Sequence, residues 1–479
     1  MGALNPRGAP VADDSKEFDL IVIGSGPGGY VAAIRASQLG MKAACVEADK
    51  LGGVCLNIGC IPTKSLLTSA LLVNEVKGAD KHGISIGELS VDMGPAQERS
   101  RKVANQLNRG VGMLFRKNKV THIEGWGRLA GDGKVEVETS DGTDTYRAEH
   151  ILVATGSRPR SLPFLEIDGE RIWSSDHALF VKEAPESLAI VGAGAIGMEF
   201  ADIFEAYGSQ VTILEALDRV LPVEDRDISA QMAKAYRKRG MTIHTGARLE
   251  SSEVVDDGVV LRFKDKDGKD QELKVERVLS AVGRIPNTED VGLDRAGVKL
   301  TERGNFIEVD EWLRTNVSGV YAVGDCAGGA LLAHKASHEG ITCIEKIAGV
   351  SHGPVDHGNI PNCTYSHPEV ASVGLTEEQA REAGHDIEVG KFPWVGNGRA
   401  LAHGDSEGFI KVIRDRKYSE ILGAHIIGPH ATELIAEFVI GRHLETTAEE
   451  MEKAIHPHPT LSEAVAEAAL ASLGRAIHI

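Results

Sequence analysis

The sequence is poor in basic side chains and has no long apolar stretch. It carries 52 lysines and arginines against 70 aspartates and glutamates, a net charge of -18. Nucleic acids and anionic membranes attract the opposite sign of charge, so this balance argues against either as a partner. No apolar run approaches the ~18 residues of a membrane span, and the stretch 188–198 is broken by glycine before Glu199. We therefore expect a soluble protein.

Cysteine is scarce too, with 6 residues in 479. They are too few and too scattered for a secreted disulfide framework, so we expect a reducing cytoplasm in which any disulfide is catalytic. The cysteines also lack the spacing of a zinc site, and no metal is expected. The N-terminus has no apolar segment of a secretory signal, and we expect residues 1–17 to form a disordered arm.

Glycine, in contrast, is abundant, and its positions reveal an internal repeat. Its 54 residues are about 11% of the chain against a usual ~7%. Segments 19–47 and 187–215 each contain an apolar run, three glycines, a helical pattern and a second apolar run that ends in glutamate. Glu47 follows Gly24 at the same interval as Glu215 follows Gly192. We therefore predict two copies of one supersecondary unit.

The repeated unit has the pattern of strand, glycine turn and helix that binds dinucleotides. The first glycine allows a tight turn, the second lets backbone N–H groups reach a pyrophosphate, and the third lets the helix pack on the strand. The helix N-terminus adds the positive end of its dipole. The predicted positions are Gly24, Gly26 and Gly29 in the first copy and Gly192, Gly194 and Gly197 in the second.

The glutamate that ends each copy indicates which dinucleotide binds. A carboxylate at this place accepts hydrogen bonds from the ribose hydroxyls and repels a 2′-phosphate. Glu215 therefore favours NAD over NADP, although Arg219 leaves NADP open, and Glu47 has the same place in the first copy. Because electrons pass from one dinucleotide to the other, we expect one fixed FAD and one exchangeable NAD.

Breaks in the hydrophobic pattern divide the chain further. Apolar runs at 151–159 and 278–286 end in glycine and proline, which places boundaries near 157 and 283. Asp325 stands just past another apolar strand, at the sheet edge where ligands bind. After residue 354 alternating strands and then helices predict a separate α+β module. The predicted fold is α/β, with segments 1–17, 18–157, 158–283, 284–353 and 354–479.

Cys55 and Cys60 follow the first repeat directly. A bridge between them requires a distorted turn, because a regular helix would point them about 140° apart. Gly59 and Pro62 are well placed to distort one, and the ammonium of Lys64 falls on the helical face of Cys60. Two ordinary buried thiols remain an alternative, but the nucleotide fold beside them favours a redox pair. We expect the other four cysteines to be core residues: Cys45, Cys326, Cys343 and Cys363.

Two histidines near the C-terminus, His456 and His458, precede a predicted helix. Imidazole is the side chain whose ordinary pKa lies near neutrality, as a base for thiol exchange requires. Thr460 and Glu463 have the spacing of a capping box. Glu463 therefore either caps the helix or orients a histidine, and neither role excludes the other.

These segments together resemble one known family over nearly the whole chain from Phe18. GGVCLNIGCIPTKSLL, LRTNVSGVYAVGD, LAHKASHEG, FPWVGNGRA and HPHPTLSE are similar to the signatures of the pyridine nucleotide-disulfide oxidoreductases, in the same order. Within that family the resemblance is to the flavoproteins that serve 2-oxo acid dehydrogenase complexes. It implies two Rossmann-like domains, FAD-binding at 18–157 and NAD-binding at 158–283. It further implies a central domain at 284–353 that completes the FAD site and a dimerisation domain at 354–479.

The resemblance also implies roles for single residues. Cys55 would exchange with a dithiol substrate, and the Cys60 thiolate would contact the flavin. His458 would be the general base with Glu463 as its partner. The cofactor residues implied are Lys64 with Glu199 beside the flavin, Asp325 at the ribitol, Gly127, Thr155, Gly156 and Ala333 beside FAD, and Ala281, Gly283 and Arg284 at the nicotinamide.

The implied activity is oxidation of protein-bound dihydrolipoyl groups with reduction of NAD, in a homodimer whose histidine comes from the second subunit. The partner would be a lipoyl-bearing protein of a 2-oxo acid dehydrogenase or glycine cleavage system. Two alternatives remain, a glutathione-reductase-like disulfide reductase and a flavin-bearing assembly subunit.

Overall fold

The computed structural model describes residues 16–479, so residues 1–15 of the arm expected at 1–17 lie outside the described residues. Glu17, which we assigned to the arm, is instead the first residue of strand β1 (Glu17–Ile23). It lies opposite Arg147 of β6 (Gly142–Val153), and Lys16 forms an ion pair with Asp144. The ordered sheet therefore reaches the first described residues.

The described chain forms two compact units, each built from segments that are not contiguous. The first contains the residues up to Pro62, Arg101–Arg158 and Arg284–Val355. The second contains Thr63–Ser100, Pro159–Gly283 and Asp356–Ile479. Two helices belong in part to both units, α3 (Cys60–Lys77) and α4 (Met93–Lys117).

A mixed sheet forms the centre of the first unit. Its order is β3-β2-β1-β6-β5-β4, and β17 pairs with the end of β6. The strands β1, β2 and β3 run parallel with the second half of β6, whereas β4 and β5 form an antiparallel hairpin against its first half. The remaining bounds are β2 (Ala43–Glu47), β3 (Thr121–Glu124), β4 (Trp126–Gly131), β5 (Lys134–Thr139) and β17 (Val320–Ala322).

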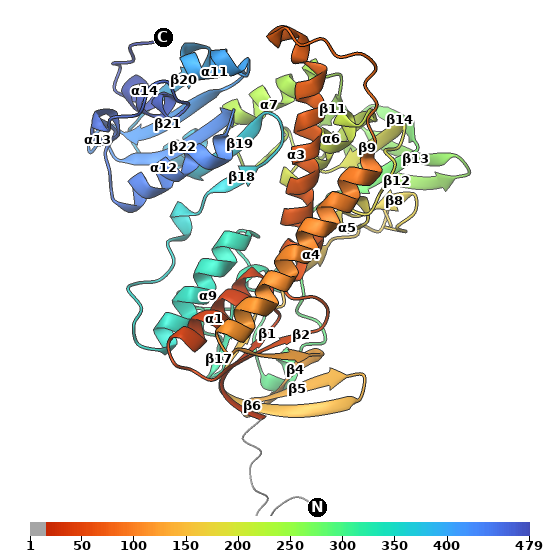
Figure 1. Ribbon diagram of the computed structural model, residues 1–479, viewed down its shortest axis with the longest axis vertical. Helices are drawn as coiled ribbons and strands as arrows, with labels where there is room; N and C mark the ends of the chain where they lie inside the picture. The colour runs from red at the N-terminus through yellow and green to blue at the C-terminus, as the bar shows by residue number, and fades with distance from the viewer. Residues whose placement is uncertain (1–15) are drawn as a thin grey trace, which may run out of the picture. The chain divides into compact units, whose positions relative to one another are not determined.

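Helices α1 (Pro27–Gln38) and α9 (Ala333–Ile347) lie side by side against this sheet (Figure 1). Their contact is so close that a Cβ on Gly340 would lie 2.6 Å from the carbonyl oxygen of Gly28. Leu20 and Val22 of β1 belong to the core beneath these helices. Because strand side chains alternate, the intervening residues of β1 belong to the core on the other face, with helix α8 (Leu293–Ala296).

A second parallel sheet, in the second unit, contains the second copy of the repeat. Its order is β11-β10-β9-β15-β8. The repeat is formed by β9 (Ser187–Val191), α6 (Ala195–Ala206) and β10 (Gln210–Glu215). The other elements are β8 (Ile172–Trp173), α7 (Arg226–Lys238), β11 (Thr242–Thr245), β15 (Arg277–Ser280) and the antiparallel strands β12 (Arg248–Val255), β13 (Gly258–Lys264) and β14 (Asp270–Val275).

The C-terminal part of the second unit is an antiparallel sheet with helices. The sheet order is β18-β19-β22-β21-β20, and α12 and α14 pack on it. The bounds are β18 (Asn362–Thr364), β19 (Glu369–Gly374), β20 (Ile387–Pro393), β21 (Phe409–Asp415), β22 (Ile421–Gly428), α12 (Ala431–His443), α13 (Ala448–Lys453) and α14 (Glu463–Ser472). The predicted fold class, two Rossmann-like folds and a C-terminal α+β module, is confirmed.

One segment qualifies the expectation that nothing in the chain resembles a membrane span. Gly53–Lys77 is long and apolar enough to cross a bilayer, by length and composition only. A search for uninterrupted apolar runs misses it, because polar residues such as Asn57 and Lys64 divide it. A core helix of a soluble protein passes the same test, so this stretch by itself carries no conclusion about a membrane.

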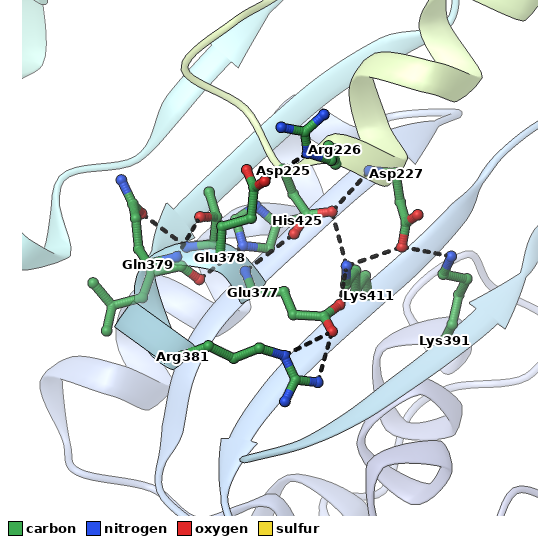
Figure 2. Close-up of polar contacts among 12 residues, drawn as sticks. Asp225, Arg226, Asp227, Glu377, Glu378, Gln379, Arg381, Lys391, Lys411 and His425 are labelled. Carbon is green, nitrogen blue, oxygen red and sulfur yellow. Dashed lines mark hydrogen bonds and ion pairs between the residues drawn. The ribbon is translucent and has the colours of Figure 1, made fainter. Parts of the chain in front are cut away.

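A buried lysine ties α7 to the C-terminal sheet (Figure 2). Lys411 of β21 is 2% exposed, and its ammonium contacts Asp225 at 2.8 Å, Asp227 at 2.9 Å and Glu377 at 2.7 Å. Asp225 and Asp227 stand at the start of α7, and Glu377 begins α10 (Glu377–Glu382). One cation thus joins three elements that are distant in sequence.

Lys411 lowers the pKa of these three acids. Burial is the largest single influence on the pKa of Asp225 and Asp227, and it would raise both values. At Asp225 the hydrogen bond and charge of Lys411, together with His425, outweigh it. At Asp227 the hydrogen bonds and charges of Lys391 and Lys411 together do so. At Glu377 the hydrogen bond from Lys411 is the largest influence on the pKa. Since all three values are depressed, the network stabilises the fold above about pH 4, and this contribution is lost as the pH falls through the folded-state pKa values.

We predict that Lys411→Met lowers the free energy of unfolding by about 3 kcal/mol at pH 7, because it leaves buried Asp225 without a cation. Lys391→Met is the matched control, since Lys391 pairs with the same Asp227 at 2.8 Å but is exposed. The free energy of unfolding of Lys391→Met should fall by no more than about 0.5 kcal/mol. Urea unfolding measures both variants, and equal losses would contradict the role given to the buried cation.

Candidate nucleotide and active sites

The first glycine turn is shaped by two contacts that a side chain would block. Gly24 has φ +99°, and a Cβ there would lie 2.4 Å from the carbonyl oxygen of Ala154. A Cβ on Gly29 would lie 1.9 Å from the carbonyl oxygen of Gly24. These contacts give the physical reason for glycine at the first and third positions of the motif.

Gly26, the middle glycine, differs because nothing lies within 4 Å of its Cβ position. It is the N-cap of α1, and Pro27 occupies the first helical position. The first N–H groups of a helix have no partner within the helix, and its dipole is positive at this end. The turn therefore fits the pyrophosphate of a dinucleotide.

The second glycine turn repeats this geometry in the other unit. Gly192 has φ +102°, and its Cβ would lie 2.4 Å from the carbonyl oxygen of Ala281. A Cβ on Gly197 would lie 2.0 Å from the carbonyl oxygen of Gly192, while the space at Gly194 is open. Both copies are thus suited to the same kind of ligand.

The glutamate of each copy holds its own turn, a role that the sequence analysis missed. Oε2 of Glu47 accepts hydrogen bonds from the N–H and the hydroxyl of Ser25. Glu215 accepts hydrogen bonds from the N–H groups of Ala193 at 2.7 Å and Leu217 at 2.8 Å. Because each carboxylate oxygen has two lone pairs, this role leaves acceptor capacity for ribose hydroxyls.

Arg219, which left NADP open, is engaged elsewhere. Its Nη2 donates to Oε2 of Glu378 at 3.1 Å and to the carbonyl oxygen of Pro222. Because this guanidinium is paired with a carboxylate, it is less suited to bind a 2′-phosphate. This contact and the position of Glu215 both favour NAD in the second copy.

Asp325 lies in a short turn, η3 (Gly324–Ala327), that follows β17. The hydroxyl of Ser157 donates to its Oδ2, and Nε of Arg284 donates to that hydroxyl at 2.8 Å. Arg284, which the resemblance implies at the nicotinamide, thus contacts Ser157 through its guanidinium. Ser157 itself was missed, although it directly follows the predicted Thr155 and Gly156.

Four further residues predicted beside FAD, Gly127, Thr155, Gly156 and Ala333, also lie in the first unit. A Cβ on Gly127 of β4 would lie 3.1 Å from Val46, and the hydroxyl of Thr155 donates to the carbonyl oxygen of Asn287 at 2.6 Å. Gly156 has φ +71°, and Ala333 is the first residue of α9. In the second unit, Ala281 and Gly283 follow β15.

The two cysteines flank a break between two helices. Cys55 lies in α2 (Gly53–Ile58), and Cys60 is the first residue of α3. At the break, a Cβ on Gly59 would lie only 3.2 Å from the Cα of Cys55, so the chain folds back on itself there. This is the distorted turn that a bridge requires. Pro62 does not form the break, because it lies in the first turn of α3, where proline is tolerated.

Helix α2 is attached directly to the first glycine turn. A Cβ on Gly53 would lie 2.7 Å from the Cα of Gly26, and the N–H of Gly52 donates to the carbonyl oxygen of Ser25 at 3.0 Å. The amide of Asn57 fixes α2 from its other end, by donating to the carbonyl oxygen of Gly53 at 2.9 Å. The fold therefore places the cysteine pair against the turn that fits a pyrophosphate.

Lys64 and Glu199 form an ion pair in the second unit, with both carboxylate oxygens 2.9 Å from the ammonium. The same carboxylate accepts a hydrogen bond from the N–H of Tyr365 at 3.0 Å. The ammonium lies over the ring of Tyr365, 4.6 Å from its centroid. Tyr365 was missed by the sequence analysis, since no motif connects it with residues 300 positions away.

The structure distinguishes the two histidines near the C-terminus. His456 is mostly buried, and its ring contacts Glu437 of α12 at 3.0 Å and the carbonyl oxygen of Ala454. His458 is 80% exposed, and its Nδ1 contacts Oε1 of Glu463 at 2.9 Å. An exposed imidazole oriented by a carboxylate is arranged as a general base.

Glu463 orients His458 and also binds the backbone before α14, but the predicted capping box does not form. Its Oε2 accepts a hydrogen bond from the N–H of Thr460 at 2.8 Å. Thr460 is not the N-cap, however, because the helix begins at Glu463 and the Thr460 hydroxyl donates to Pro457. Burial would raise the pKa of Glu463, but the hydrogen bonds from Thr460 and His458 hold it below its ordinary value.

The remaining cysteines lack the features of a reactive thiol. Cys45, Cys326 and Cys343 are fully buried, as predicted, and burial raises the pKa of each. Cys363 is half-buried, and burial raises its pKa to about 12. Thiols with raised pKa values are poor nucleophiles at neutral pH.

Comparison with known proteins identifies similar chains over almost the full length. A family model described as pyridine nucleotide-disulphide oxidoreductase matches residues 18–340, and one for the dimerisation domain of that group matches residues 360–469. The dihydrolipoyl dehydrogenase of Zymomonas mobilis is 47% identical over 463 residues, which cover 96% of this chain and 99% of that protein. That of Rhizobium etli is 46% identical, with 97% and 100% covered.

Two solved structures have the same fold. LpdA from Mycobacterium tuberculosis has a TM-score of 0.87 and 29% identity, with 94% of this chain and 98% of that one covered. The HOCl-induced flavoprotein disulfide reductase RclA from Escherichia coli has a TM-score of 0.82 and 28% identity, with 94% and 99% covered.

We predict that Gly59→Ala shifts the equilibrium of the Cys55 and Cys60 pair about tenfold toward the dithiol, because the added methyl group strains the fold-back at the break by about 1–2 kcal/mol. Alkylation and mass spectrometry across a series of dithiothreitol ratios measure the shift. Gly110→Ala on α4 is the control, since nothing lies within 4 Å of its Cβ position. An equilibrium that is the same in both variants would remove Gly59 from this role.

Proposed function

This chain belongs to the pyridine nucleotide-disulphide oxidoreductase family, and we propose that it is a dihydrolipoyl dehydrogenase. It oxidises a protein-bound dihydrolipoyl group to the lipoyl disulfide and reduces NAD⁺ to NADH. The observation that carries the redox chemistry is the packing of Gly53, at the start of the cysteine helix, on Gly26 of the nucleotide turn. The full-length likeness to dihydrolipoyl dehydrogenases at 46–47% identity supports the choice of substrate.

Two dinucleotides, FAD and NAD, serve the reaction. The first glycine turn, Glu47 and Asp325 would hold FAD, and the second turn and Glu215 would hold NAD. When bound, FAD would supply the two-electron acceptor that lies between the reduced cysteines and NAD⁺. The Lys64 ammonium, fixed by Glu199 and Tyr365, would supply positive charge in this reaction.

The cysteines and the histidine carry out the thiol exchange. His458 takes a proton from the dihydrolipoyl dithiol, and Glu463 stabilises the imidazolium that forms. The resulting thiolate attacks Sγ of Cys55, breaks the Cys55–Cys60 bond and releases Cys60 as a thiolate. The second substrate thiol then displaces Cys55 and closes the lipoyl disulfide. The substrate loses two electrons, and the cysteine pair gains them.

The dimerisation domain supports a homodimer, in which His458 would serve the cysteine pair of the partner chain. Its 80% exposure in the single chain is consistent with a base that acts on a group outside its own surroundings. The substrate would arrive on a lipoyl-bearing protein of a 2-oxo acid dehydrogenase or glycine cleavage system. The few, scattered cysteines favour a cytoplasmic location.

A second candidate is a disulfide reductase that takes electrons from the nicotinamide. The likeness to RclA, at a TM-score of 0.82, supports it. Both candidates use the same cysteines and cofactors, and they differ in the substrate that reaches Cys55.

We predict fast NADH formation when the purified protein is mixed with dihydrolipoamide and NAD⁺, and a rate at least tenfold lower with NADP⁺, because Glu215 repels the 2′-phosphate. Absorbance at the nicotinamide band measures both rates. A flavin-loaded protein that leaves dihydrolipoamide unchanged but reduces glutathione disulfide would contradict the proposed substrate and favour the second candidate.

We predict that His458→Gln lowers turnover of dihydrolipoamide by about 10²–10⁴-fold, because the reaction loses its base. His456→Gln is the control, since His456 has a carboxylate partner too but is mostly buried against α12. It should keep turnover within a few-fold of the original protein. Stopped-flow measurement of cysteine reduction locates the defect, and a loss of the same size in both variants would argue against a base at His458.

A further inference from the structure

The turn that presents Asp325 rests on a buried ion pair of the neighbouring helix. Lys335 and Glu339 of α9 are 1% and 2% exposed, and Nζ of Lys335 lies 3.0 Å from Oε1 of Glu339. On the exposed surface of a helix, an ion pair one turn apart is common and stabilises the protein only weakly. Here both charges are removed from water, which costs free energy and calls for a compensating role.

The pair makes contact with both ends of η3. The ammonium of Lys335 donates to the carbonyl oxygen of Gly328 at 2.6 Å and to that of Gly324 at 3.4 Å. Oε2 of Glu339 accepts a hydrogen bond from the N–H of Gly324 at 2.8 Å. With the ion pair itself, all three protons of the ammonium have an acceptor.

Glycine occupies both clamped positions for a backbone reason. Gly324 has φ +74° and Gly328 has φ +84°, conformations that other residues adopt only at a cost. A turn between two glycines has much conformational freedom to lose, so it needs fixed contacts to stay in one shape. Between its ends stands Asp325, whose carboxylate is oriented by Ser157.

We propose that Lys335 and Glu339 are positioning residues that hold Asp325 ready for the flavin nucleotide. The inference rests on the proposed function, in which Asp325 binds FAD. The ion pair fixes the backbone of the turn, and Ser157 with Arg284 fixes the direction of the carboxylate. FAD then binds without the cost of ordering this segment.

The test follows the loss of FAD from the purified holoprotein after dilution, by the rise of flavin fluorescence. We expect Lys335→Met and Glu339→Gln to release FAD about 10–100-fold faster. Glu345→Gln is the control, because Glu345 on the same helix pairs with Arg35 of α1 at 2.7 Å and does not contact η3. It should release FAD at the original rate.

Two further variants separate positioning from a loss of stability. Lys335→Met combined with Glu339→Leu replaces the buried pair by apolar side chains, which should recover the unfolding midpoint but not FAD retention. Lys335→Met added to Asp325→Asn should release FAD no faster than Asp325→Asn alone, because Lys335 acts through Asp325.

Independent, additive effects of Lys335→Met and Asp325→Asn would overturn the proposal, and so would full FAD retention in the double apolar variant. If Lys335→Met does not fold, Glu339→Gln carries the test, since it preserves side-chain volume. Failure of the proposed function has another signature, an original protein that holds no FAD at all.

Discussion

Backbone must approach backbone at the nucleotide turns, and the rest of the arrangement depends on this constraint. At Gly24, Gly29 and Gly53 a Cβ atom would lie between 1.9 and 2.7 Å from a main-chain atom of another residue. These distances are too short for any residue with a side chain. The first two contacts build the turn, and the third attaches the cysteine helix to it. The same close backbone contacts therefore shape the turn that fits a pyrophosphate and hold the cysteine helix against it. A methyl group at any of these positions would separate the strand, the helix and the cysteines from one another.

Buried charges fix the backbone at other places in the fold. Lys335 and Glu339 fix a turn between two glycines, Lys411 fixes the start of α7, and Glu199 holds both Lys64 and the backbone of Tyr365. Replacing such a pair by apolar side chains often stabilises a protein, so stability alone does not explain these charges. These charged groups hold the neighbouring backbone in one orientation, because each of them makes several hydrogen bonds at once.

The sequence predicted the fold class and most candidate residues, because glycine spacing and apolar periodicity are local properties. It could not predict contacts that tertiary packing alone creates. Lys335 and Glu339 have the spacing of an ordinary exposed helix pair, and nothing in the pattern indicates that α9 is covered on that side. The contact of Arg284 with Ser157 could not be foreseen, since a motif does not show in which direction a guanidinium turns. Thr460 was misjudged because α14 begins only at Glu463, later than the capping pattern expects.

The two copies of the repeat share their turn but differ in the helix that follows, and this difference fits their separate tasks. In the first copy Gly28 and Ala32 leave room for α9, which brings Lys335 and the turn of Asp325. When the glycines of the two repeats are aligned, Phe200 of α6 corresponds to Ala32 of α1, and this much larger side chain is buried. A dinucleotide in the first copy would thus gain a second clamped segment, whereas among the described elements no helix packs on α6 as closely as α9 packs on α1. Such an asymmetry suits a cofactor that stays, FAD, beside one that must leave after each turnover, NAD.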